Sequence, residues 1–168
     1  MRLAIAVGLG AAAVAVVTAA LFFYLAITVV PGNPAPVAEE GGLEGYDQTV
    51  VYIGDVGLLT DIADDDDKKS LGLGVRDSMG EGEAMLFPFK VEGRYSFWMH
   101  GMKFPIDIIW LDSDKTVVHI EHSLEPCTSF DCPTYAPNED AVYVLETVAG
   151  FSEKRGVVEG TRAEFQLG

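Results

Sequence analysis

The sequence predicts a mainly β domain of the β-rich α+β class. The expected form is a small antiparallel barrel or sandwich with one or two short helices, preceded by a single transmembrane helix. Two observations lead to this prediction. Residues 49–168 contain seven or eight short segments rich in aromatic and β-branched residues, separated by turn residues. Residues 3–30 carry no charged side chain, which is typical of a membrane-spanning helix.

The leading segment is long enough to cross a bilayer, since about 20 apolar residues span a hydrocarbon core of about 30 Å. Arg2 precedes it, and the first acidic residue after it is Glu39. This asymmetry favours a cytoplasmic N-terminus and an extracytoplasmic C-terminal domain. The alternative is a signal peptide cleaved at Thr18-Ala19-Ala20, but its apolar region is normally only about 7–15 residues long. We therefore expect an uncut, single-pass signal-anchor at residues 1–30 in the cell membrane.

The composition of residues 31–168 limits the number of domains and the class of partner. Residues 31–48 are rich in Pro, Gly and Glu, which indicates a linker, and residues 49–168 are long enough for one domain. The formal net charge is −15, and such an excess of carboxylates repels phosphate backbones. Nucleic acid is therefore not an expected partner, whereas the membrane, contacted through residues 3–30, and a membrane-protein partner are.

The densest apolar run of the domain divides into two expected core strands, Tyr95–His100 and Ile106–Leu111. Gly101 tolerates a positive φ and Pro105 cannot donate to a sheet, so a corner is predicted between them. We expect Thr49–Ile53 and Leu58–Ala63 to form a hairpin, and Lys90–Arg94 to connect a third strand to Tyr95–His100 in a second hairpin. The remaining strands are expected at Ala84–Phe89, Thr116–His122, Ala141–Val148 and Ala163–Leu167.

The acidic run Asp64–Asp67 predicts the start of a short helix, because carboxylates are favourable at a helix N-terminus. A calcium-binding loop is the alternative. It does not fit the spacing, since Ala63 or Lys68 would occupy positions that need an oxygen ligand.

Cys127 and Cys132, the two cysteines of the chain, lie in a long polar segment rich in proline. In an extracytoplasmic domain such a pair predicts a disulfide. A free or metal-binding pair and a redox-active pair are alternatives, although the spacing is not Cys-x-x-Cys.

Several short motifs occur in a fixed order along the domain: Gly72–Arg76, Ala84–Phe89, Phe97–Met99, Pro105–Ile109, Pro133–Tyr135, Val144–Glu146 and Ala149-Gly150. In this order they resemble DUF192, a bacterial and archaeal family of domains of unknown function. The resemblance implies a small β-rich domain, often exported or lipid-anchored, without an established activity. The family usually has Lys-Asn-Thr where this chain has His100-Gly101-Met102, so a role of that Lys or Asn is not implied here. The long hydrophobic anchor is a feature of this chain.

Asp107 is the most informative single residue, because it is a carboxylate inside an apolar strand. Strand alternation places it on one face with Ile109 and Leu111. If that face is buried, the carboxylate needs Arg76 or backbone amides as partners, and it acts as a structural clamp. Alternatively, Asp107, Arg76, Trp98 and His100 form a ligand cleft for a sugar or peptide. Tyr135 completes the candidate ligand-binding residues.

Weaker patterns suggest other chemistry. Met99, His100 and Met102 are soft or borderline donors that suit copper, but neighbouring strand residues point to opposite faces. Glu83, Glu146 and Asp107 could pair as acid and base in a hydrolase. The chain has no nucleophile, zinc or phosphate-loop motif, so no cofactor is expected and an enzyme is disfavoured.

Three functions remain open. The first is a non-catalytic extracytoplasmic domain that works through a protein partner as an accessory subunit of a membrane assembly. The second is a cell-surface domain that binds a small ligand or glycan. The third is a copper-handling domain or an unrecognised hydrolase.

Overall fold

The computed structural model of the chain describes residues 42–168. The predicted transmembrane helix and most of the predicted linker lie outside these described residues. Within residues 42–168, no helix is long and apolar enough to cross a membrane.

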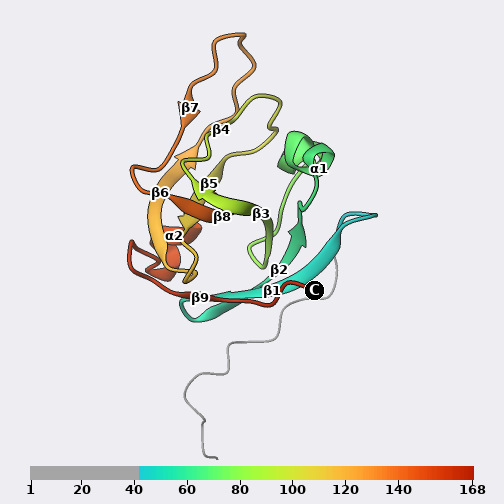
Figure 1. Cartoon of the computed structure of the whole chain (residues 1–168). Helices are drawn as coiled ribbons and strands as arrows, with labels where there is room; N and C mark the ends of the chain where they lie inside the picture. The colour runs from blue at the N-terminus through green and yellow to red at the C-terminus, as the bar shows by residue number, and fades with distance from the viewer. Residues whose placement is uncertain (1–41) are drawn as a thin grey trace, which may run out of the picture. The chain divides into compact units, whose positions relative to one another are not determined.

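A curled seven-stranded sheet forms the framework of the domain, with the strand order β6-β5-β8-β3-β2-β1-β9 (Figure 1). Its strands are β1 (Asp47–Ile53), β2 (Val56–Ile62), β3 (Glu83–Gly93), β5 (Ile106–Leu111), β6 (Val117–Leu124), β8 (Ala141–Val148) and β9 (Ala163–Glu164). A separate two-stranded sheet and three short helical segments complete the described elements: β4 (Phe97–Trp98), β7 (Thr134–Tyr135), α1 (Asp66–Leu71), η1 (Gly72–Val75) and α2 (Phe151–Arg155). The prediction of a mainly β domain with few short helices is confirmed.

The large sheet is mixed rather than purely antiparallel. All its neighbouring strands run antiparallel except β2 and β3, which pair in parallel from Leu59↔Glu83 to Ile62↔Leu86. Parallel neighbours need a crossover connection, and α1 and η1 lie in the segment that supplies it. The expectation of an antiparallel barrel or sandwich is corrected at this pair.

The two outer strands of the sheet approach each other at one end. The amide of Val117 donates to the carbonyl of Thr161 at 2.8 Å, and the amide of Ala163 donates to the carbonyl of Lys115 at 2.8 Å. An isolated antiparallel bridge joins Thr116 to Arg162. These bonds draw the first residues of β6 to the start of β9, so the curled sheet closes partway towards a barrel.

Each face of the sheet packs against a separate apolar cluster. The first cluster includes Leu86, Ile109 and Leu145, together with Phe151 of α2. The second cluster includes Ile108 and Val144 from the opposite face, and Leu73 of η1. Since β3, β5 and β8 contribute alternate residues to the two clusters, the central strands are buried on both sides.

The predicted hairpin of β1 and β2 is confirmed. The helix after the acidic run is confirmed as well, with Asp65 as its N-cap accepting a hydrogen bond from the amide of Lys68. At the predicted corner, Gly101 has a φ of 78°.

The prediction of a core strand at Tyr95–His100 is wrong. Only Phe97–Trp98 is a strand, and it pairs with β7 rather than with β3. The predicted second hairpin does not form, because β3 continues to Gly93 and pairs with β2 and β8. Trp98 is 56% exposed; the aromatic side chains of this segment cover one face of the large sheet instead of entering it.

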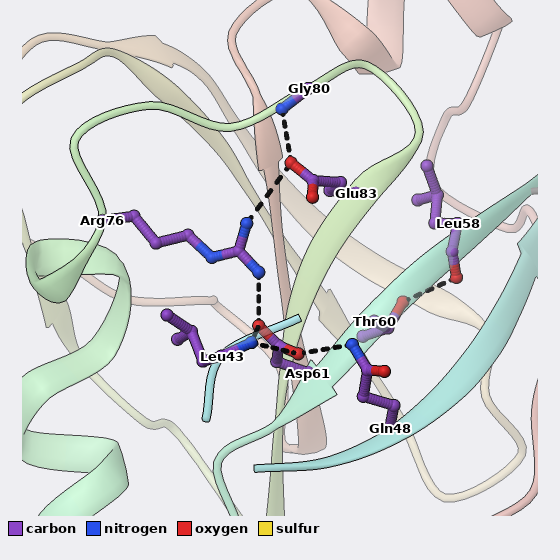
Figure 2. A network of polar contacts seen from close by, with 8 residues as sticks. All are labelled: Leu43, Gln48, Leu58, Thr60, Asp61, Arg76, Gly80 and Glu83. Atoms are coloured by element: carbon purple, nitrogen blue, oxygen red, sulfur yellow. Dashed lines mark hydrogen bonds and ion pairs between the residues drawn. The ribbon is translucent and has the colours of Figure 1, made fainter. Parts of the chain in front are cut away.

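A buried ion pair fixes the crossover segment onto β2 (Figure 2). The guanidinium of Arg76, just after η1, donates to the carboxylate of Asp61 and lies 3.3 Å from that of Glu83. Asp61 also accepts hydrogen bonds from the backbone amide of Leu43 and, at 2.9 Å, from the side-chain amide of Gln48. Burying the two charges costs desolvation energy, but leaving one of them buried without its partner costs more. The network therefore holds the end of η1 against β2.

Asp107 of β5 ties the end of β6 to the start of α2. Its Oδ1 accepts hydrogen bonds from the amides of Ser123 at 2.8 Å and Gly150 at 2.9 Å, and its Oδ2 accepts one from the amide of Ser152 at 2.8 Å. The side chain is fully buried. The clamp interpretation therefore describes Asp107, and backbone amides rather than Arg76 are its partners.

Two unusual backbone conformations aim these amides at Asp107. Ser123 has a φ of 49° where the register of β6 against β5 shifts, and Gly150 has a φ of 76° at the N-cap of α2. A positive φ is unfavourable for a residue with a side chain such as Ser123. The hydrogen bond to a buried carboxylate offsets this cost.

We expect Asp107→Ala to lower the free energy of unfolding by at least about 3 kcal/mol, because three amide donors lose their acceptor and each buried unsatisfied donor costs about 1–3 kcal/mol. Denaturant unfolding of the full chain in detergent, followed by tryptophan fluorescence, measures the change. Asp114→Ala is the matched control, since Asp114 is exposed and its loss should change stability little. Equal stability of the two variants would contradict the clamp.

Candidate functional site

A third buried carboxyl group lies on β8, on the sheet face opposite to Asp107. Glu146 pairs across the sheet with Ile108 of β5 and Met85 of β3, so its neighbours within the sheet are apolar. Its side chain is 4% exposed, and its Oε2 atom has no hydrogen-bond partner. Burial raises the pKa of Glu146 from 4.5 to about 8. At neutral pH the group is therefore mostly a carboxylic acid, able both to donate and to accept a hydrogen bond.

Glu146 lines a small cavity of about 50 Å³ between the sheet and the segments that cover it, which are the α1–η1 crossover and the residues around β4. The residues around it come from three parts of the chain: the α1–η1 crossover, the central strands, and the segment around β4. They are Lys69, Ser70, Leu71, Gly72, Leu73, Phe87, Phe97, Trp98, His100, Met102 and Glu146.

The cavity is large enough for several water molecules or for one small polar group, since a single water needs roughly 10–15 Å³ by a comparable measure. Trp98 and the exposed His100 line it, and their rings are tilted against each other with centroids 5.1 Å apart. Phe87 and Phe97, in edge-to-face contact at 5.0 Å, also line it. A group that enters therefore meets aromatic surfaces and a carboxyl group that has unused hydrogen-bonding capacity.

The lining of this cavity bears on the two-carboxylate hydrolase suggested by the sequence. No second carboxyl group and no cysteine are among the described residues that line it. The pairing of Glu83 or Asp107 with Glu146 that a two-carboxylate hydrolase requires does not occur there, because Glu83 lies beside Arg76 and Asp107 is bound by amides.

A wider groove of about 500 Å³ lies between β6 and α2. Its titratable residues, His122, Glu153 and Glu159, are all exposed. The one fully buried polar residue that lines it is Ser152, whose amide already binds Asp107. The Oγ of Ser152 and the Oε2 of Glu146 both lack a hydrogen-bond partner. A carboxyl group offers two oxygens to a ligand and can also carry a charge, whereas a hydroxyl offers one oxygen, so the cavity over Glu146 is the stronger candidate.

The structure brings together two of the five ligand-binding residues predicted from the sequence. Trp98 and His100 both line the cavity. Arg76 belongs to the Asp61 network, and Asp107 lies on the opposite face of the sheet. Tyr135 pairs with Phe97 through β7 and packs against the second cluster, but it does not line the cavity.

The three candidate metal ligands also separate. Met99 and Met102 are both buried in the second cluster, whereas His100 is exposed; His100 and Met102 line the cavity and Met99 does not. Cys127 and Cys132 have the geometry of a disulfide, with their Cα atoms 5.8 Å apart and their sulfur atoms within bonding distance of each other. Among the residues that the structure describes, no group of three or more His, Cys, Asp and Glu side chains could hold a metal ion.

Sequence reasoning did not identify Glu146 as the central residue of a site. The signal that marked Asp107 is present here too, because Glu146 is a carboxylate inside the apolar strand Ala141–Val148. Its position near the end of the strand is also compatible with exposure, and residues of η1 and of the segment around β4, distant in the sequence, lie beside it in the cavity.

Comparison with known proteins gives a family and a relative within it. Residues 50–165 match the family model of DUF192, described as an uncharacterized ACR. A UPF0127 protein of Pyrococcus abyssi is 34% identical over 107 residues, which cover 62% of this chain and 84% of the relative.

Two solved structures share the fold. A protein from Sinorhizobium meliloti, described as a "putative transcription regulator", has a TM-score of 0.65 and 28% identity, and the match covers 71% of this chain and 95% of that one. A protein of unknown function from Novosphingobium aromaticivorans has a TM-score of 0.64 and 23% identity, with 77% and 93% covered.

The raised pKa of Glu146 makes the stability of the domain depend on pH. Between about pH 4.5 and pH 8 the folded state binds a proton that the unfolded state has released, so stability falls by about 1.4 kcal/mol per pH unit as the pH rises. We expect Glu146→Gln to lack this contribution. Denaturant unfolding at pH 5 and pH 8 should show the variant gaining roughly 4 kcal/mol relative to the wild type. If the free energy of unfolding of the wild type and that of Glu146→Gln changed equally with pH, Glu146 would have an ordinary pKa.

Proposed function

The chain belongs to the DUF192 family, and on that premise we propose that its domain is a non-catalytic binding domain whose cavity takes up a polar group of a small ligand. The observation that supports this most is the buried Oε2 of Glu146, which has no partner in a cavity lined by Trp98 and His100. A carboxyl group kept buried without a partner lowers stability, and a ligand that supplies the missing hydrogen bond removes that penalty.

We also propose that residues 3–30 anchor the domain in the cell membrane and that residues 49–168 lie outside the cytoplasm. The uncharged leading segment and Arg2 before it support this orientation. The disulfide between Cys127 and Cys132 supports it further, since such bonds persist in oxidising compartments. The protein partner of an accessory subunit stays a prediction. Exposed apolar side chains such as Leu71 and Phe130 are compatible with one.

The description of the Sinorhizobium protein as a transcription regulator does not carry over well to this chain. Regulators that bind DNA neutralise phosphates with Lys and Arg, whereas this chain has 11 Lys and Arg against 26 Asp and Glu. The proposed ligand is therefore small, and its recognition depends on the cavity.

Ligand uptake is testable through Trp98. The chain has two tryptophans, and Trp110 is fully buried, so fluorescence changes caused by added ligands report on Trp98. Acetamide, N-acetylglucosamine, methylurea and methylguanidinium are titrated into the full chain in detergent. We expect at least one of them to give a saturable change that Glu146→Leu abolishes and the control Glu153→Gln retains. If none does so, the proposal of a binding cavity is wrong.

The compartment is testable through the two cysteines. Protein taken from cells, denatured and treated with a maleimide reagent should react only after reduction, because both thiols are bonded to each other. Immediate reaction of both thiols would indicate a reducing compartment. Protease added to intact cells should in addition cut the predicted linker before Leu43, because Leu43 and Gln48 are bonded to Asp61 and β1 begins at Asp47. Full protection of the domain would contradict the orientation.

A further inference from the structure

We propose that the group taken up by the cavity is a small organic cation, an ammonium or guanidinium group that pairs with Glu146. This inference rests on the proposed binding function and assigns its ligand class. Three features of the cavity support it. The carboxyl group is buried and one of its oxygens has no partner, the walls are aromatic, and no positively charged side chain among the described residues is bonded to the carboxyl group.

The first feature is geometric. Oε2 of Glu146 has no hydrogen-bond partner although the side chain is almost fully buried. Asp107 and Asp61, the other two buried carboxylates, each accept several hydrogen bonds. A donor brought by a ligand would give Glu146 what the domain itself gives to the others. A cationic donor forms the strongest such bond, because charge-assisted hydrogen bonds are roughly twice as strong as neutral ones.

The second feature is the lining. Phe87, Phe97 and Trp98 surround the space next to Glu146, and aromatic faces attract ammonium and guanidinium groups through their quadrupoles. The size agrees, because a cavity of about 50 Å³ accommodates the head of such a group and excludes a larger ring. The formal net charge of −15 favours the approach of a cation.

The third feature concerns the other titratable groups that face the cavity, which are Lys69 from α1 and His100 from the segment after β4. The ammonium group of Lys69 donates to the carbonyl of Asp64 at 3.0 Å and lies 5.4 Å from the ring centroid of Phe89. Neither Asp64 nor Phe89 lines the cavity. From the sheet, the neighbours of Glu146 are the apolar Met85 and Ile108, so no cation of the described chain is bonded to Glu146.

Cation binding has a measurable consequence, because it requires Glu146 to lose its proton. With a pKa of about 8 in the free protein, uptake at pH 7 releases about 0.9 proton per cation bound. Affinity should rise about tenfold from pH 6 to pH 7 and change little above pH 9. A neutral ligand would show neither effect.

The test compares methylguanidinium with methylurea, which have nearly the same shape and differ in charge. Binding to the full chain in detergent is followed by Trp98 fluorescence, and proton release by calorimetry in buffers of different ionisation enthalpy. We expect methylguanidinium to bind at least tenfold more tightly than methylurea, with proton release at pH 7. Glu146→Gln should remove both the preference and the proton release.

Two controls complete the design. Glu153→Gln changes the net charge by the same amount at an exposed position outside the cavity, and it should bind like the wild type. His100→Gln should keep the proton release, which separates Glu146 from His100 as the titrating group. Equal or tighter binding of methylurea, or methylguanidinium uptake without proton release, would overturn the cation inference. A methylurea complex that depends on Glu146 would still leave the binding function standing.

An additional arm identifies the source of the cation. Acetyl-arginine amide carries the same guanidinium group as methylguanidinium, joined to a peptide backbone. Tighter binding of the arginine derivative would assign the cavity to a side chain of another protein, and tighter binding of methylguanidinium would assign it to a free small cation. Both results support the cation class.

Discussion

A buried carboxyl group must either be surrounded by donors or give up its charge, and the two central strands of this domain show both solutions. On β5, Asp107 accepts three backbone hydrogen bonds and connects β6 with the start of α2. On the adjacent strand β8, Glu146 faces the other cluster with its Oε2 unpartnered. The carboxyl group on one face of the sheet is therefore fully bonded within the domain, whereas the one on the other face keeps an oxygen without a hydrogen-bond partner, and the proposed function depends on this difference.

The cover over Glu146 depends on polar contacts made outside the cavity. The ion pair of Arg76 with Asp61 fixes the end of η1 to β2, and Leu73 of η1 lies in the second cluster. On the other side of the cavity, the pairing of β4 with β7 positions Trp98. Arg76, which the sequence suggested as a direct ligand, thus acts on the cavity only through the segment that it holds.

The sequence permitted accurate prediction where local patterns decide the outcome. Strand alternation placed Asp107 on the correct face, and the run of aspartates correctly indicated the start of α1. The partners of segments distant in the sequence were harder to predict. Tyr95–His100 has the composition of a core strand, yet its exposed Trp98 shows that tertiary packing and not β-propensity determined its place. Glu146 was named from the sequence only as a candidate acid or base of a hydrolase. Its place in a cavity could not be predicted, because the other cavity-lining segments include residues more than 40 positions earlier in the chain.

The short last strand has a greater role than its two residues suggest. β9 pairs with β1, and the residues beside it bond to the first residues of β6. The two ends of the curled sheet therefore meet at β9. Open strand edges are templates for pairing with other chains. By occupying an edge at each of two strands, the C-terminal residues leave fewer backbone groups for edge-to-edge association, so contacts with other molecules depend more on side chains.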